Sequence, residues 1–142
     1  MNPMTKPGSQ TNTRRGSAVL EASLLLTLFV LVIFCLFDFG FSLFLHETYV
    51  HQARTGARYG AVSPDDLTAI KNMVLYNKTT GGGVGYMGLT PGSVLVARNG
   101  SPGDSDDCIV VTVSGYTFTW FTPGFAGKKT GKPIIVTVPV EN

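Results

Sequence analysis

The fold of this chain is decided by residues 14–62, RRGSAVLEASLLLTLFVLVIFCLFDFGFSLFLHETYVHQARTGARYGAV. From Ala22 to Leu45 this stretch has 24 residues, of which only Asp38 is charged. At about 1.5 Å per residue, a helix over this segment is about 36 Å long, which is enough to cross a bilayer. The stretch therefore predicts one rod made of a cytoplasmic leader (1–16), a transmembrane helix (17–45) and its periplasmic continuation (46–62).

The residues ahead of the apolar run indicate which kind of membrane segment this is. An ordinary secretory signal has a short apolar region followed by small residues at the cleavage site. Here Gly16 and Ser17 precede the apolar run, so a cut between them leaves the anchor attached. The order of basic residues, Gly16, four further residues and Glu21 resembles a prepilin leader.

Three blocks together resemble one known family. They are Arg14–Gly16 with Glu21, Phe37–Gly40, and Ala53 with Gly56–Val62. As a set they resemble the TadE-like family of minor pseudopilins in tight-adherence (Tad) pilus systems, over roughly residues 14–62. The resemblance implies a pilin-like protein of the bacterial inner membrane that takes part in Tad pilus assembly and adherence, with no enzymatic activity and no cofactor.

The same resemblance implies the partners. They are a prepilin peptidase that cuts between Gly16 and Ser17, other pilus or pseudopilin subunits, an inner-membrane assembly platform and the lipid bilayer. A second interpretation remains open, namely a signal-anchored binding domain that captures a ligand or envelope partner without entering a pilus. The cleavage after Gly16 and the role of Glu21 distinguish the two, since only a pseudopilin needs them.

Two carboxylates lie near the two sides of the membrane segment, Glu21 at its entry and Asp38 near its exit, about 25 Å apart along a helix. An isolated charge in lipid is costly, so each needs a partner or the interface. For Glu21 the resemblance implies recognition by the peptidase and then pairing with the N-terminal amine of a neighbouring subunit; the alternative is an interfacial carboxylate at a helix N-terminus. For Asp38, a snorkelling or capping carboxylate and a contact with another subunit both remain open.

The charges predict the orientation of the membrane segment. Lys6, Arg14 and Arg15 precede the apolar run, so the N-terminus is expected in the cytoplasm and the C-terminal part outside. Residues 1–13 are polar and are expected to be disordered. Without those three cations, the 11 basic residues fall to 8 against 9 acidic ones, so the net charge changes from +2 to −1. Nothing in this balance indicates a nucleic-acid surface.

Small residues recur beyond the apolar run, at Ala53, Ala57 and Ala61 with Gly56 and Gly60 beside them. Glycine is unfavourable in a helix by about 1 kcal/mol relative to alanine, so this seam predicts close packing of another element. The packing partner is either the chain's own sheet or a neighbouring subunit.

Residues 63–142 predict a small extracytoplasmic α+β domain. Ser63 is expected as the N-cap of a second helix, with Pro64 at its first position. Leu67, Ile70 and Val74 give that helix an apolar stripe, and Asn77 with the run Gly81–Gly83 ends it.

Three strands are expected after this helix, over residues 93–97, 108–121 and 134–140, in an antiparallel sheet packed on the helices. A change of phase in the middle strand predicts a bulge at Ser114–Gly115. Pro139 predicts that the last strand lies at an edge or ends there. The fold class is therefore α+β with a long N-terminal helix.

No catalytic, cofactor or metal site is expected. His46 and His51 are five residues apart, which places them about 140° apart around a helix. The acids Asp104, Asp106 and Asp107 do not fit a calcium loop and predict a solvated hairpin loop. The run Gly127–Thr130 predicts a basic loop tip. Cys35 and Cys108 are expected to be two buried thiols, not a disulfide.

Overall fold

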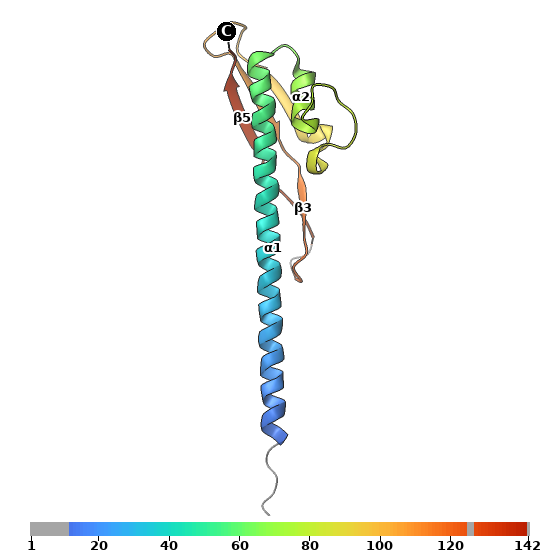
Figure 1. The fold of residues 1–142 in the computed structure, drawn as a ribbon. Helices are drawn as coiled ribbons and strands as arrows, with labels where there is room; N and C mark the ends of the chain where they lie inside the picture. The colour runs from blue at the N-terminus through green and yellow to red at the C-terminus, as the bar shows by residue number, and fades with distance from the viewer. Residues whose placement is uncertain (1–11, 125–126, 142) are drawn as a thin grey trace, which may run out of the picture.

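The computed structural model describes residues 12–124 and 127–141, with side chains described from residue 16 onward. A single helix, α1, forms a rod, and the remaining elements gather at its C-terminal end (Figure 1). The elements in chain order are α1 (Asn12–Val62), α2 (Leu67–Tyr76), the short 3-10 turns η1 (Tyr86–Gly88) and η2 (Pro91–Ser93), β1 (Val94–Asn99), β2 (Cys108–Val113), β3 (Thr117–Trp120), β4 (Gly127–Thr130) and β5 (Ile134–Pro139). The expected α+β class is confirmed. The leader expected over residues 1–16 lies largely outside the described residues.

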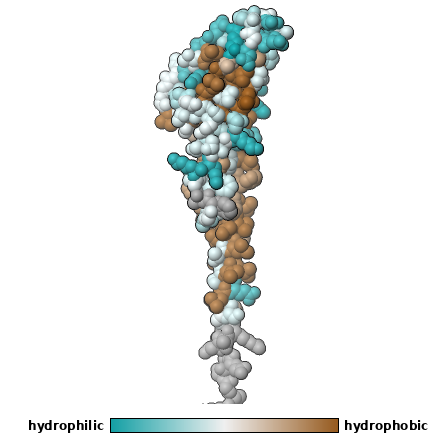
Figure 2. Space-filling model, turned by 180° about the vertical axis from the view of Figure 1, so that it is seen from behind, coloured by the Kyte–Doolittle hydropathy of each residue, from teal (hydrophilic) through white to brown (hydrophobic). Residues whose placement is uncertain are grey.

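The rod has two parts, called here the lower rod (residues 16–45) and the upper rod (residues 46–62). Over Gly16–Val62 the helix is long and apolar enough to cross a membrane, and its most apolar segment is not buried inside the chain. Figure 2 shows hydrophobic surface along the lower part of the rod. Leu20 and Phe37, for example, are each 72% exposed. The chain itself therefore provides no cover for most of the lower rod.

The upper rod packs against the head, which comprises residues 63–141. A Cβ atom added to Gly60 would lie 2.9 Å from Cδ1 of Ile70 on α2 and 3.0 Å from Cγ2 of Ile109 on β2. A Cβ atom added to Gly56 would lie closer still to Cγ2 of Val74 on α2. The expected close packing is thus found within the chain, and α2 contributes to it together with the sheet.

The main sheet has the strand order β1-β2-β5 and is antiparallel throughout. On the central strand, Ile109, Val111 and Val113 are fully buried, as their alternation predicts. α1 packs against β2 and β5, while α2 packs against β1. The result is two layers, helices over one sheet, with β5 at an edge and Pro139 as its last residue, as expected.

The long middle strand expected over residues 108–121 is wrong. The chain leaves the main sheet after Val113: the Ser114 N–H donates to Ser93 O at 2.8 Å, and Gly115 takes a left-handed conformation (φ 71°). Residues beyond this turn form β3, which pairs with β4 in a separate two-stranded sheet. Gly127–Thr130, expected as a loop tip, is therefore a strand. The chain therefore leaves the main sheet at this point, whereas a bulge would have kept both halves of the strand in one ladder.

The start of α2 also differs from the prediction. Asp66 is the N-cap, because its Oδ1 accepts from Ala69 N at 2.8 Å. The Ser63 N–H still bonds Tyr59 O at 3.0 Å, so Ser63 closes the last turn of α1. Leu67 remains 39% exposed, while Ile70 and Val74 are buried. Asn77 ends the helix in a left-handed conformation (φ 55°), as expected.

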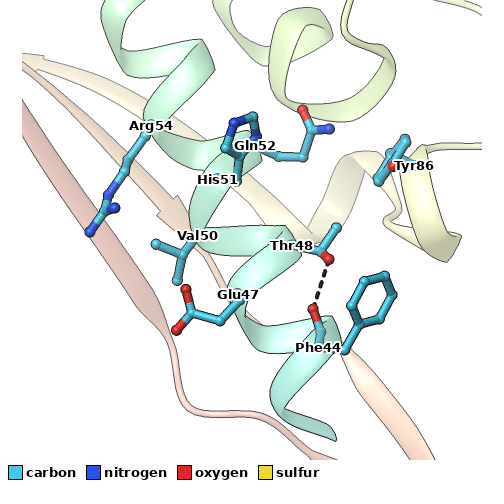
Figure 3. Close-up of a pocket in the computed structure, with 8 residues that line it drawn as sticks. All are labelled: Phe44, Glu47, Thr48, Val50, His51, Gln52, Arg54 and Tyr86. Carbon is cyan, nitrogen blue, oxygen red and sulfur yellow. Dashed lines mark hydrogen bonds between the residues drawn. The ribbon is translucent and has the colours of Figure 1, made fainter. Parts of the chain in front are cut away.

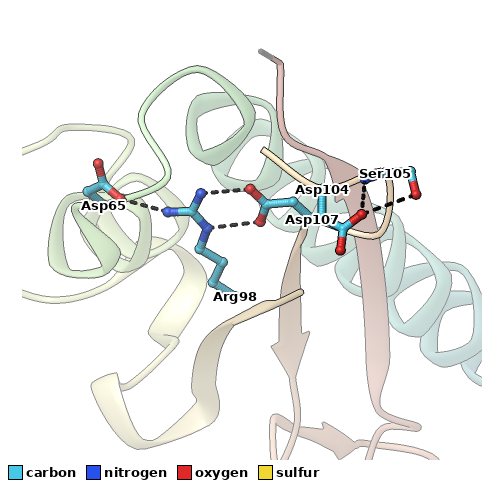
Figure 4. A network of polar contacts seen from close by, with 5 residues as sticks. All are labelled: Asp65, Arg98, Asp104, Ser105 and Asp107. Carbon is cyan, nitrogen blue, oxygen red and sulfur yellow. Dashed lines mark hydrogen bonds and ion pairs between the residues drawn. The ribbon is translucent and has the colours of Figure 1, made fainter. Parts of the chain in front are cut away.

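A polar network fixes the β1–β2 hairpin (Figure 4). Arg98 donates to both oxygens of Asp107, at 2.9 and 2.7 Å, and to Asp65 at 2.6 Å. Asp107 is only 2% exposed, so the expectation that all three loop acids are solvated is wrong for this residue. The hydrogen bonds and charge of Arg98 lower the pKa of Asp107, and Asp107 in turn raises the pKa of Arg98.

Candidate functional site

The predicted processing site lies near the start of the described helix. Gly16, Ser17 and Glu21 are all exposed and all belong to α1. Ser17 and Glu21 are four residues apart, so they lie on one face of the helix about 6 Å apart along its axis. Among the described side chains, Glu21 has no hydrogen-bond or ion-pair partner. A cut before Ser17 would therefore create an amine one helical turn from an unpaired carboxylate.

Asp38 behaves differently, because it is satisfied within its own chain. Its side chain is only 6% exposed. Phe121 N donates to it at 3.0 Å and Thr122 N at 2.7 Å, and the Thr122 hydroxyl also donates. These donors belong to the turn after β3, so the carboxylate holds this turn against the rod. The predicted contact of Asp38 with another subunit stays a prediction.

A second contact ties the same hairpin to α1 closer to the head. His46 Nδ1 and the Tyr116 hydroxyl are 2.7 Å apart, and the ring of Tyr116 meets that of Tyr49 edge-on at 4.8 Å. Gly131 lies directly against the Tyr116 ring, where a side chain would not fit. Burial raises the pKa of both tyrosines. The β3–β4 hairpin is thus held to α1 at His46 and at Asp38, eight residues or about 12 Å apart along the axis.

A groove of about 450 Å³ lies along the upper rod (Figure 3), lined by Phe44, Glu47, Thr48, Val50, His51, Gln52, Arg54 and Tyr86. Figure 3 shows Glu47, Val50 and Arg54 on one side of the helix, and Gln52, Thr48 and Tyr86 on the other. These side chains do not converge on one point, so they form no catalytic arrangement. Within the described residues, no group of three or more His, Cys, Asp or Glu side chains could hold a metal ion.

The sequence identified Gly16, Ser17, Glu21 and Asp38 but not the donors to Asp38. The signal for these donors is weak: Phe121–Thr122–Pro123–Gly124 contains turn residues after an aromatic strand, but nothing in it indicates a distant carboxylate. Cys35 and Cys108 are both free; Cys35 is exposed on the lower rod and Cys108 is half-buried in β2. The prediction that both are buried is therefore wrong.

Comparison with known proteins gives one match. Residues 16–58 match the family model described as TadE-like protein. This confirms the resemblance inferred from the sequence blocks and locates it on the lower rod and most of the upper rod. No curated protein and no solved structure matches the chain. The match and the apolar N-terminal helix fit a Tad-associated protein with a single membrane anchor.

Proposed function

We propose that this chain is a TadE-like minor pseudopilin that takes part in assembling or priming a Tad pilus and has no enzymatic activity of its own. The observation that carries the proposal is the family match over residues 16–58. The proposed location is the bacterial inner membrane, with the N-terminus in the cytoplasm and the head in the periplasm or outside the cell. Lys6, Arg14 and Arg15, on the N-terminal side of the apolar run, support this orientation.

The exposed surface of the lower rod supports membrane insertion and subunit contacts. Its large apolar side chains face outward around the helix, as in Leu24 (69% exposed) and Phe29 (62% exposed). A helix that is apolar all round is stable only when lipid or other protein surrounds it. Lipid would cover the lower rod before assembly, and the corresponding helices of pilus or pseudopilin subunits would cover it afterwards.

Glu21 provides the proposed chemistry of assembly. A prepilin peptidase cuts between Gly16 and Ser17 and creates a cationic amine at Ser17. Glu21 is exposed and has no partner among the described side chains. In the apolar layer between packed subunits, an amine and a carboxylate attract each other strongly, because the local dielectric constant is low. Glu21 of one subunit therefore pairs with the processed N-terminus of its neighbour.

Glu21 variants test this proposal in a strain that makes the pilus. Glu21→Leu and Glu21→Gln are expected to abolish pilus-dependent adherence while membrane levels of the protein stay normal. Glu47→Gln is the matched control, because Glu47 is an exposed glutamate on the same helix above the lower rod. Wild-type adherence from both Glu21 variants would contradict the assembly role.

The second candidate function is a signal-anchored binding domain outside any pilus. The observation that favours it is that the head, residues 63–141, lies beyond the family match. Under this function Gly16 and Glu21 have no role, so Glu21→Gln would leave every activity of the chain intact.

A further inference from the structure

The two-stranded sheet of β3 and β4, called here the β3–β4 hairpin, lies beside the rod and apart from the main sheet. In Figure 1, β3 runs down beside α1, away from the rest of the head. Its base is held at His46 and its turn at Asp38, which belongs to the lower rod. The hairpin therefore lies next to the part of the rod that is expected to enter the membrane, and any role for the hairpin at the bilayer rests on the proposed membrane anchoring of α1.

The depth of Asp38 can be derived from the length of the helix. Glu21 and Asp38 are about 25 Å apart along the axis, and the hydrocarbon layer of a bilayer is about 30 Å thick. With Glu21 at the inner boundary, Asp38 lies at the outer boundary or a few ångströms inside it. A carboxylate at that depth needs hydrogen bonds from protein, since water is scarce there. Phe121 and Thr122 provide them, so the hairpin turn also lies at this boundary.

The side chains of the hairpin suit this location. Phe121 is 70% exposed, and the half-buried rings of Phe118 and Trp120 stack at 6.3 Å. On β4, Lys128 and Lys129 are exposed. Aromatic side chains prefer the membrane interface, and lysines near it are attracted to anionic lipids.

A groove of about 310 Å³ lies between the hairpin and α1, and its lining includes Leu43, Phe118 and Lys132. It offers an apolar wall and a cation at the same level of the rod. Ser42 and His46 also line this groove, four to eight residues or about 6–12 Å beyond Asp38 toward the head, so it lies in the headgroup layer and fits a phosphate headgroup.

We propose that the β3–β4 hairpin is a second membrane anchor, which binds the anionic phospholipid headgroups of the outer leaflet and sets how deeply α1 is inserted. The hairpin stays in the headgroup layer, because the sheet of β3 and β4 has two strands and each leaves one backbone edge unpaired. Phe121 in the turn faces the acyl boundary, while Lys128 and Lys129 leave opposite faces of β4 and each reaches phosphates on its own side of the hairpin.

Trp120 is the only tryptophan in the chain, so its fluorescence reports the position of the hairpin. The full chain is reconstituted in vesicles of phosphatidylglycerol with phosphatidylcholine, and in vesicles of phosphatidylcholine alone. Brominated lipids in the vesicles quench the fluorescence of a nearby tryptophan. We expect lipids brominated close to the headgroup to quench Trp120 more than lipids brominated deep in the acyl chain, and iodide in the buffer to quench it weakly.

Two sets of variants identify the groups responsible. Lys128→Glu with Lys129→Glu is expected to lower the ratio of membrane-bound to free hairpin in phosphatidylglycerol vesicles by more than about fivefold per lysine, because each substitution removes a positive charge and adds a negative one. Lys71→Glu with Lys78→Glu, on and after α2, is the charge-matched control and is expected to leave the ratio unchanged. Asp38→Asn weakens the hold on the turn and is expected to shift Trp120 emission to longer wavelength.

Three results would overturn the proposal. The first is strong quenching by iodide with none by bromolipid, and the second is an equal effect of both lysine pairs. The third is quenching of Trp120 that changes when the chain is mixed with its Trp120→Phe variant. Such a change would show that a second copy of the chain, and not lipid, contacts the hairpin. No other pilus component is present in these vesicles, so failure here leaves the pseudopilin role untouched, and failure of the Glu21 test leaves the hairpin result standing.

Discussion

The lower and upper parts of the rod belong to one uninterrupted helix, but they differ in how their side chains are covered. The lower rod is the more hydrophobic part and is mostly exposed, whereas the upper rod is less hydrophobic and has a buried face. In the lower rod, large side chains such as Leu20 and Phe37 are each 72% exposed. In the upper rod, Ala53 and Ala57 are fully buried and Ala61 is 3% exposed. The buried apolar residues of the upper rod are thus small apart from Tyr49, which is 2% exposed, whereas the lower rod exposes mainly large apolar ones.

This difference shows that the two parts are adapted to different surroundings. The upper rod packs within the chain, where small residues let α2 and β2 approach the helix backbone closely. The lower rod keeps side chains that gain free energy only when something outside the chain covers them. The helix therefore joins a segment that packs within the chain to one whose apolar side chains the chain itself leaves uncovered.

The strongest test of this contrast is the same substitution in both parts. Gly56→Leu would force a side chain into Val74, and overpacking of this kind costs about 1–3 kcal/mol or more. Gly40→Leu is the matched control, because a Cβ there meets nothing within 4 Å. Urea unfolding in detergent micelles, followed by near-ultraviolet circular dichroism, should show a large loss of stability for Gly56→Leu alone. Equal losses would show that the lower rod is packed as the upper rod is.

A smaller effect is expected from acid on the head. Asp107 has a lowered pKa because it accepts hydrogen bonds from Arg98. Its contribution to the free energy of unfolding is therefore complete above the unfolded pKa of 3.8 and is lost as the pH falls through the lower folded value. Near-ultraviolet dichroism of the head should weaken in this range, while the far-ultraviolet helix signal of the lower rod persists. Asp107→Asn should remove this pH dependence; if it does not, another group is responsible.

The rod and the main sheet could be predicted from the sequence because local patterns determine them. Ile109, Val111 and Val113 alternate in a way that only a strand with one buried face explains. Gly56 and Gly60 predicted close packing but not its partner, since small residues carry no information about which element approaches. The sequence left both the sheet and a neighbouring chain open, and the structure shows α2 with the sheet.

The β3–β4 hairpin and its contact with Asp38 could not be predicted in the same way. Glycine permits a wide range of backbone conformations, so Gly115 in the sequence does not tell whether the chain continues its sheet through a bulge or leaves it. Asp38 and Thr122 are 84 residues apart in sequence, so no local pattern connects them. The pair of Arg98 and Asp107 is a similar case. The sequence of the loop predicts solvated acids, and only the structure shows that Arg98 pairs with Asp107.

A pseudopilin has to be cut by a prepilin peptidase between Gly16 and Ser17, ahead of its membrane helix. The intact mass of the mature chain shows directly whether this cut occurs. The chain is produced with and without a prepilin peptidase, and beside it a Gly16 variant with a bulky residue at that position. We expect the peptidase to remove residues 1–16, so that the product begins at Ser17, and the Gly16 variant to stay uncut. A product that still begins at Met1, or one cut after the apolar run, would contradict the pseudopilin assignment.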